Sequence, residues 1–148
     1  MFHDELNYLG KFYPDLSSTL GDELLRPTKI YVKPLLETIK QFGGDIKGIS
    51  HITGGGHYEN IPRMLPEGIR ARIEVSKFPQ MPIFKMLAHK GSIPERDMYN
   101  TYNMGIGLVM AVSEDKADDI MSALRDHGET PIHIGYCTNS DIGVDILW

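Results

Sequence analysis

The sequence contains one cysteine, Cys137, among its 148 residues. This excludes an internal disulfide and a cysteine-built zinc site, and it is typical of a reducing compartment such as the cytoplasm. Two interpretations of the thiol remain open. It is either a quiet residue in the core, where lone cysteines usually lie, or a reactive group.

Long apolar runs and an excess of basic residues are also missing. No stretch reaches the ~20 apolar residues of a membrane span. The acidic start from Met1 to Glu5 lacks the basic flank and apolar core of a signal peptide. The formal net charge of -5 argues against broad electrostatic capture of nucleic acid. We therefore expect a cytoplasmic protein with neither a membrane nor a nucleic acid as partner.

Several catalytic signatures are absent as well. There is no Gly-x-x-x-x-Gly-Lys phosphate loop, no Gly-x-Ser-x-Gly elbow and no nucleophile beside a base. The six histidines show no spacing that suits a metal site. No catalytic residue or metal ligand is therefore assigned, and the sequence does not contain a complete active site.

The residues that are present predict one folded domain preceded by an arm. Residues 1–26 mix single apolar residues with turn formers and lack sustained periodicity, which favours a linker or arm. Residues 27–148 have ordinary apolar and charged contents and show no internal repeat. This length fits a single hydrophobic core.

Hydrophobic periodicity predicts the elements of this domain. Helices are expected after Pro34, Pro82, Pro94 and Ser113, the first of them closed by Gly43 and Gly44. Strands are expected at 30–32, 47–53, 69–75, 105–112 and near 132–136 and 144–146. The run 105–112 is almost continuously apolar, so we expect it to be covered on both faces. Together they predict an α+β fold with a mixed β-sheet and helices packed on its faces.

The sharpest local feature is the segment from His51 to Gly56, which places three glycines after a strand and before a helix. Successive glycines allow backbone N–H groups to face an anion, and a helix N-terminus adds attraction. The other interpretation is a flexible turn without a ligand.

Side chains around this loop also have two interpretations. Arg63 is a candidate phosphate ligand or the partner of Glu59 in a surface salt bridge. His51 is a candidate ligand contact or acid/base group, or else a hydrogen-bonded core residue.

A second polar segment runs from Asp97 to Gly107 into the apolar strand. Asn103 is a candidate to orient an amide or a ribose, and Gly105 and Gly107 allow close approach of backbone or ligand. The alternative is a satisfied turn followed by tight strand packing.

Three stretches, in order, resemble one family: Leu24 to Lys33, Ile49 to Arg63 and Met98 to Gly107. The family is phosphoribosylformylglycinamidine cyclo-ligase, also called aminoimidazole ribonucleotide synthetase, and the likeness runs from about Thr19 to the end. The sequence is similar to its carboxyl-terminal half, whose fold the resemblance describes as three-layer and partly ferredoxin-like. Glycine loops of the related amidotransferase, selenophosphate synthetase, thiamine-monophosphate kinase and hydrogenase maturation protein resemble this one less.

The resemblance implies an ATP-dependent ring closure of formylglycinamidine ribonucleotide to aminoimidazole ribonucleotide in purine biosynthesis. It places ATP and Mg²⁺ mainly in an amino-terminal half that this sequence does not include, together with the homodimer contact. This chain alone is then expected to bind ATP weakly and not to turn over substrate.

The resemblance also implies a set of substrate-binding residues. The loop would hold an anionic part of the ligand, and Thr28 would help to shape the same cleft. The implied substrate-binding residues are His51, Thr53, Gly54, Gly55, Gly56, Asn60, Arg63, Asn103 and Gly105.

The sequence departs from the family pattern at three positions near these residues. His57 stands where an aromatic residue is usual, Asp97 where Glu is usual and Tyr102 where Phe is usual. A different class of function remains open beside the enzyme: a non-catalytic, stand-alone module that binds an anion or a partner.

Overall fold

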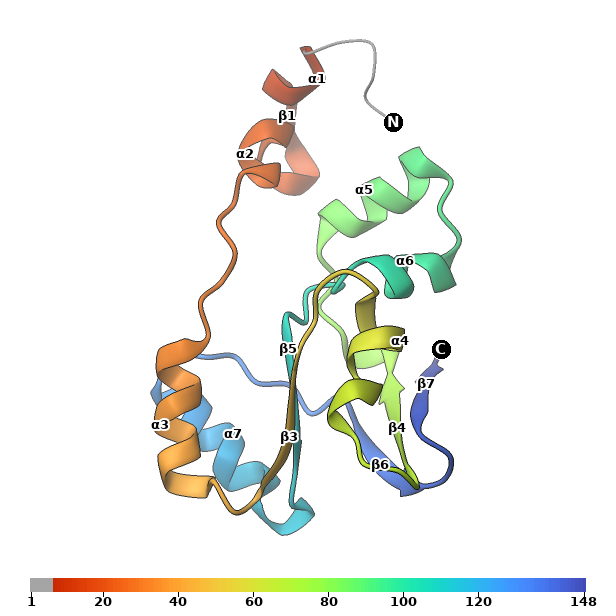
Figure 1. The fold of residues 1–148 in the computed structure, drawn as a ribbon. Coiled ribbons are helices and arrows are strands. Elements are labelled where there is room, and N and C mark those ends of the chain that lie inside the picture. The colour runs from red at the N-terminus through yellow and green to blue at the C-terminus, as the bar shows by residue number, and fades with distance from the viewer. Residues whose placement is uncertain (1–6) are drawn as a thin grey trace.

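A computed structural model describes residues 7–148 (Figure 1). The first six residues of the predicted arm lie outside the described residues. The helices are α1 Asn7–Gly10, α2 Leu20–Leu24, α3 Val32–Phe42, α4 Gly56–Asn60, α5 Pro82–Gly91, α6 Glu95–Thr101 and α7 Ala117–Asp126. The strands are β1 Phe12–Tyr13, β2 Ser18–Thr19, β3 Ile46–His51, β4 Ile69–Glu74, β5 Leu108–Val112, β6 Gly135–Asn139 and β7 Gly143–Leu147. Four 3₁₀ turns are described: Pro14–Leu16, Pro62–Met64, Val75–Lys77 and Glu114–Lys116.

A three-stranded mixed sheet has β4 at its centre, antiparallel to β6 and parallel to β7. The predicted alternation in β4 is confirmed, because Ala71 and Ile73 are buried in the core while Arg70 and Arg72 face Asp145 of β7. The Arg70 to Asp145 ion pair measures 2.8 Å. This alternation gives the sheet one apolar face and one charged face.

A second pair of strands, β3 and β5, positions the glycine loop. The strands are antiparallel, and His51 at the end of β3 pairs with Leu108 at the start of β5. The glycine loop follows β3, and the segment from Asn103 to Gly107 precedes β5. Antiparallel pairing therefore brings these two loops to the same end of the strand pair.

The main core gathers residues from the strands and from α4 and α6. Its fully buried members include Ile61, Met98 and Ile52, with 0%, 1% and 3% of their surface exposed. Helix α3 packs on α7 beside β3 and β5 (Figure 1). The core thus lies between the mixed sheet and the elements that carry both loops.

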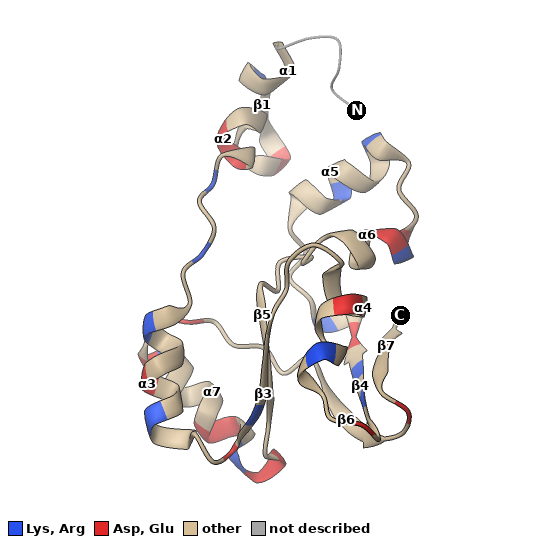
Figure 2. Cartoon of the chain, viewed as in Figure 1, with Lys and Arg blue, Asp and Glu red and all other residues tan. Residues whose placement is uncertain are grey.

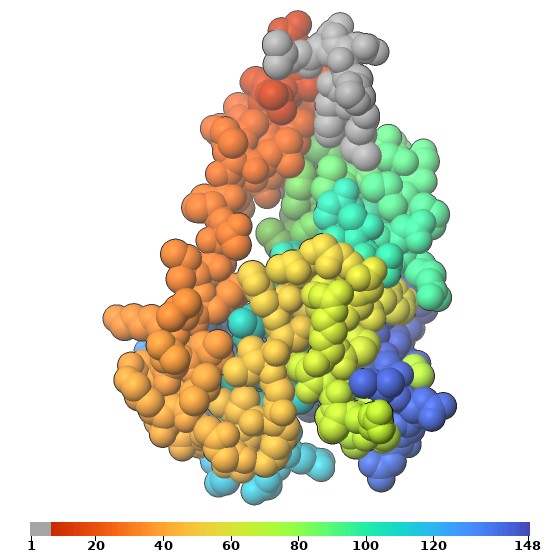
Figure 3. Space-filling view, in the orientation of Figure 1, coloured from red at the N-terminus to blue at the C-terminus, as the bar shows by residue number. Residues whose placement is uncertain are grey.

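The predicted arm has structure within its described part. Residues 7–24 form α1, the β1–β2 pair and α2, and Leu16 and Leu20 pack on Ile83 of α5. The connection from α2 to α3 is extended and mostly exposed (Figures 1 and 3). Its Ile30 and Tyr31 are not in a strand, and Val32 already begins α3, so the predicted strand at 30–32 is wrong.

Two other expectations differ from the structure. Strand β5 begins only at Leu108, and Val109 is buried while its other four residues are half-buried, so the expected coverage is only partial. The predicted strand near 132–136 begins at Gly135, which leaves Ile132 and Ile134 in residues 127–134, the segment that crosses from α7 to β6 and is called the crossing segment below. In both cases the local pattern shows apolar character but not which remote element covers it.

The α+β class is confirmed, whereas the three-layer and ferredoxin-like details are not. The described strands form three separate small sheets rather than one mixed sheet. Acidic and basic residues are interspersed along the chain (Figure 2). Within residues 7–148, no helix combines the length and apolarity needed to cross a membrane.

Candidate functional site

The glycine loop turns sharply between β3 and α4. Gly55 and Gly56 have φ angles of +89° and +54°, which favour glycine. A Cβ atom at Gly56 would strike the backbone of Tyr99, and one at Gly55 would lie 2.5 Å from Glu59 Oε2. Gly54 is different, because its Cβ position has no atom within 4 Å. Two of the three glycines are therefore required by the fold itself.

The loop leaves backbone donors unpaired. The Gly56 N–H donates to Thr53 O at 3.0 Å, and the Ile52 N–H donates to Gly107 O at 2.9 Å. The N–H groups of Gly54 and Gly55 have no acceptor among the described residues. Gly54 is exposed and Gly55 is half-buried, so both lie within reach of a ligand that offers acceptor oxygens.

The side chain of Asn60 is buried against this loop. Its amide nitrogen donates to the carbonyl oxygens of Gly56 at 2.8 Å, Gly54 at 3.1 Å and Thr53 at 3.3 Å. Only 4% of the residue is exposed. The structure thus places Asn60 on the protein side of the loop.

Arg63 makes the contact predicted by its salt-bridge interpretation. Its Nη2 lies 3.4 Å from Glu59 Oε2, and its Nη1 donates to Asn60 Oδ1 at 3.2 Å. The carboxylate of Glu59 lies beside Gly55. One carboxylate and one guanidinium therefore flank the loop, and their charges offset each other.

Asn103 lies in a hydrogen-bonded turn, as the second of the two interpretations from sequence predicts. Its Oδ1 accepts from the Gly105 N–H at 2.9 Å, and its backbone oxygen accepts from the Ile106 N–H at 2.8 Å. Gly105 has φ +91°, and a Cβ there would lie 3.0 Å from Met81 Sδ. Tight packing after the turn is thus confirmed.

His57 joins the two loops. Its Nε2 donates to Asn103 O at 3.0 Å, while its ring lies 5.0 Å from that of Phe78, centroid to centroid. The residue is 0% exposed, and its Nδ1 has no partner among the described residues. Burial lowers the pKa of His57, so the neutral ring is favoured. A neutral, engaged imidazole is poorly suited to proton transfer with a ligand.

Two of the remaining predicted residues, His51 and Thr53, lie at the exposed edge of the glycine loop. His51 and Thr53 are exposed, so the interpretation of His51 as a core residue is wrong. The ring of Tyr31 lies 6.1 Å from that of His51, and its hydroxyl lies against Gly107. Thr28 is exposed on the extended connection, and no contact joins it to the loops. The structure therefore brings together all the predicted site residues except Thr28.

Sequence reasoning missed the contribution of Tyr31 because its segment was interpreted as a strand. Gly107 carried the signal, since a glycine at the start of an apolar strand indicates close approach of another group. Ser50 was also missed. Its hydroxyl donates to the backbone oxygen of Asn60 at 2.9 Å and anchors α4 to β3.

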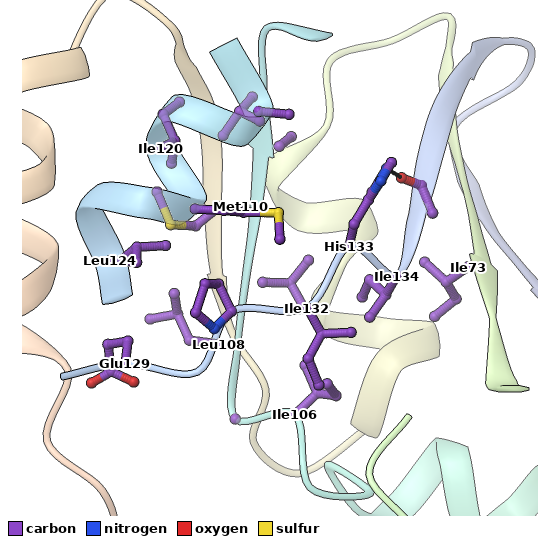
Figure 4. Close-up of a pocket in the computed structure, with 18 of the residues that line it drawn as sticks. Ile73, Ile106, Leu108, Met110, Ile120, Leu124, Glu129, Ile132, His133 and Ile134 are labelled. Carbon is purple, nitrogen blue, oxygen red and sulfur yellow. Dashed lines mark hydrogen bonds between the residues drawn. The ribbon is translucent and has the colours of Figure 1, made fainter. Parts of the chain in front are cut away.

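An apolar cavity of about 850 Å³ lies beside β5, α7 and the crossing segment (Figure 4). Leu108, Met110, Ile120, Leu124, Ile132 and Ile134 point toward it. Lys29 and Glu129 form an ion pair at its rim. Gly105 and Gly107 contribute to its lining, whereas Gly54 to Gly56 do not. The cavity is therefore a separate hollow that adjoins the second loop.

Metal and thiol chemistry find little support in these side chains. In the part of the chain that the structure describes, no three His, Cys, Asp or Glu residues gather as metal ligands. Cys137 is exposed on β6, so its expected place in the core is wrong. Although the residue as a whole is exposed, partial burial of its thiol raises the pKa of Cys137, which lowers its thiolate content at neutral pH.

The sequence of this chain is similar to that of one protein family and to several known proteins. The family model for AIR synthase related protein, C-terminal domain, matches residues 3–146. A phosphoribosylformylglycinamidine cyclo-ligase of Lachnospira eligens is 53% identical over 138 residues, which cover 93% of this chain and 40% of that protein. The relative with the same description from Agathobacter rectalis is 46% identical, and the match covers 99% of this chain and 43% of that protein. The Bacillus cereus relative with the same description is 52% identical, and the match covers 86% of this chain and 36% of that protein.

The fold is similar to that of solved structures as well. A crystal structure of E. coli HypE has a TM-score of 0.60 at 22% identity and covers 86% of this chain and 40% of that chain. A second, described as HypE, a hydrogenase maturation protein, has a TM-score of 0.59 at 23% identity, with 78% and 35% covered. This likeness supports the fold alone. The chain spans 36% to 43% of the length of the three cyclo-ligase relatives.

Proposed function

This chain belongs to the AIR synthase related protein, C-terminal domain family, and on that premise we propose that it is the substrate-side domain of a phosphoribosylformylglycinamidine cyclo-ligase. One observation carries the proposal. The loop leaves the Gly54 and Gly55 N–H groups unpaired in a chain that is 46% to 53% identical to cyclo-ligases over 86% or more of its length.

The proposed reaction closes the imidazole ring of a purine precursor. The amide oxygen of formylglycinamidine ribonucleotide takes the γ-phosphoryl group of ATP, and the substrate's own nitrogen then attacks the activated carbon. Phosphate leaves, and aminoimidazole ribonucleotide, ADP and phosphate are the products. This chemistry depends mainly on positioning and charge neutralisation rather than on a protein nucleophile.

Within this reaction the chain's residues bind and orient the ribonucleotide. Gly54 and Gly55 donate backbone N–H groups to an anionic part of the ligand. The Asn103 turn and Gly105 form the adjoining wall, and His51, Thr53 and Arg63 lie at its rim. The described residues do not fit a magnesium site, so no step of the reaction is assigned to a metal held by this chain.

The longer protein supplies the remaining parts under this proposal. The rest of a full-length enzyme binds ATP with Mg²⁺, and the whole acts in the cytoplasm as a homodimer. The isolated chain then neither binds ATP tightly nor forms product. Product formation by the purified 148-residue chain would contradict this division of labour.

The loop is tested by adding a charge at Gly54 in the full-length enzyme. The Cβ atom of Gly54→Asp has open space around it, whereas that of Gly55→Asp would clash with Glu59 and confuse the result. A carboxylate beside the bound anion is expected to raise the KM for formylglycinamidine ribonucleotide at least tenfold, an order-of-magnitude estimate for like charges in contact. Steady-state kinetics with each substrate varied in turn measures the effect.

Two variants control this experiment. Gly54→Asn has the same shape without the charge and is expected to raise the KM much less. Gly44→Asp adds the same charge at another unobstructed glycine, just after α3, and is expected to leave the KM unchanged. An unchanged KM in Gly54→Asp would remove the loop from the substrate site. Ligand binding without turnover in the full-length protein would favour a non-catalytic module instead.

A further inference from the structure

The amide of Asn60 is the point on which the glycine loop converges. Three carbonyl oxygens, those of Thr53, Gly54 and Gly56, accept from one Nδ2 atom at 2.8 to 3.3 Å. An amide nitrogen carries two hydrogens, so at least one hydrogen is shared between two acceptors. The residue is nearly fully buried, and Ser50 holds its backbone. Asn60 is thus fixed while much of the loop is exposed.

The orientation of this amide is determined from both ends. Asn60 Oδ1 accepts from Arg63 Nη1 at 3.2 Å. A flipped amide would turn its oxygen toward three carbonyl oxygens and its N–H groups toward a cation. Each of these contacts would be repulsive. Arg63 therefore supports the orientation in which Nδ2 faces the loop.

The bonds to Asn60 also determine where the loop donors point. In a trans peptide the C=O and the following N–H point in opposite directions, and every described peptide bond is trans. The carbonyls of Thr53 and Gly54 point toward the buried amide, so the N–H groups of Gly54 and Gly55 point away from it. These same N–H groups lack an acceptor among residues 7–148.

From this geometry we infer that Asn60, oriented by Arg63, is a positioning residue that holds the Gly54 and Gly55 donors outward for the ligand. The inference rests on the proposed function, because it assigns those donors to the anionic group of the ribonucleotide. Asn60 acts through the loop and does not itself contact the ligand. This differs from the expectation from sequence that Asn60 contacts the substrate directly.

Few side chains satisfy this role. Aspartate has the same shape but offers oxygens where three carbonyl oxygens already converge, so its carboxylate would drive the loop apart. Alanine removes the donor and leaves the carbonyls unpaired. Asn60→Asp therefore gives the sharpest test with the smallest change in volume.

The test uses the full-length enzyme with formylglycinamidine ribonucleotide as the probe. Asn60→Asp is expected to raise the KM for this substrate at least tenfold and to change the KM for ATP less than twofold, as order-of-magnitude expectations for lost charge-assisted donors. Without ligand, hydrogen exchange at Gly56 and Glu59, whose N–H groups donate to the loop carbonyls of Thr53 and Gly55, should become faster while exchange in β4 stays unchanged. General destabilisation would alter both regions and both KM values.

A second variant covers the case in which Asn60→Asp does not fold. Arg63→Met keeps the length of an exposed side chain but removes the donor to Oδ1. It is expected to speed ligand-free exchange at the loop as well. Asn139→Asp, an exposed change of the same type at the end of β6, is the matched control and should change none of these quantities.

The possible results separate this inference from the proposed function. Faster loop exchange together with a selective rise in the KM for the ribonucleotide supports the role of Asn60. If Gly54→Asp weakens the substrate but Asn60→Asp and Arg63→Met leave loop exchange and KM unchanged, the inference is overturned and the proposed function stands. If Gly54→Asp also has no effect, both are overturned.

Discussion

The imidazole of His57 is buried where the resembled family usually has an aromatic ring. Its Nε2 donates to Asn103 O, but its Nδ1 has no partner in the described chain. A second proton on this ring would be buried without an acceptor, which is costly. The packing therefore tolerates only the neutral form well, and protonation opposes the fold.

This arrangement predicts a pH-dependent stability. The folded pKa of His57 lies below 6.5 because of burial. The unfolded chain therefore binds a proton that the folded chain binds less readily. The contribution of His57 to the free energy of unfolding is complete above pH 6.5. It is lost as the pH falls through that value toward the folded pKa.

The matching experiment compares His57→Phe with the parent protein. The variant is expected to lose the hydrogen bond to Asn103, worth about 1 kcal/mol, but also to lose the pH dependence. Its stability relative to the parent should rise as the pH drops from 7 to 5. Urea unfolding across this range measures the difference. His89→Gln, at an exposed histidine of α5, should run parallel to the parent, and a parallel His57→Phe curve would contradict the argument.

The site residues differ in how far the sequence could reveal them. The two loops were predictable because glycines clustered at the end or the start of a strand are local signals. The role of Asn60 had a weaker signal, its position four residues after Gly56, from which a side chain can reach the preceding carbonyl. The contact of His57 with Asn103 had none, because the two residues lie 46 positions apart and no pattern joins them.

Among the elements, the segment from α1 to α2 depends on few contacts. Leu16 and Leu20 pack with Ile83 in a small cluster that adjoins the main core through Phe84 and Leu87 of α5. Thr19 caps α2, since its hydroxyl accepts from the Asp22 N–H at 3.1 Å. This segment should therefore open without unfolding the β3–β5 pair or the three-stranded sheet.

Leu20→Ala tests this local docking. Leu20 is 0% exposed, and such a truncation costs about 2 to 4 kcal/mol. Amides of α2 should exchange at least tenfold faster, whereas those of β3 and β4 should not change. Leu24→Ala, half-exposed on the same helix, is the control and should have little effect. Equal acceleration in β3 and β4 would show that the segment belongs to the main core.

Element prediction succeeded where a helix or strand carried its own boundaries. Pro82 opens α5, Gly43 caps α3, and the alternation in β4 matches its two faces. It failed at Ile132 and Ile134, because their alternation specifies apolar faces but not a pairing partner. The covering of β5 likewise depends on α7 and the crossing segment, which are remote in sequence.

At the scale of the whole molecule, the connection from α2 to α3 is exposed and rich in apolar residues. Leu25 and Ile30 are 83% and 78% exposed. Neither contributes to the core of this chain. The cyclo-ligase relatives are more than twice as long as the matched region, so we expect the remaining part of the full-length protein to cover these side chains.

Leu25→Ser and Ile30→Ser test whether the rest of the full-length protein covers these side chains or leaves them in solvent. In the isolated chain each change should alter the free energy of unfolding by less than about 0.5 kcal/mol, as for other surface positions. In the full-length protein each should cost about 1 to 3 kcal/mol if the side chain becomes buried. Parallel urea titrations of both proteins measure this. Small effects in both would place the connection in solvent throughout.

The hydrogen bond between His57 and Asn103 fastens the glycine loop to the turn that precedes β5. Neither of these two loops can then move outward without pulling on the other. Opening should then be a single event with one rate shared by the hydrogen-bonded amides of Gly56 and Gly105, and under the proposed function a ribonucleotide bound to either loop would slow the opening of both.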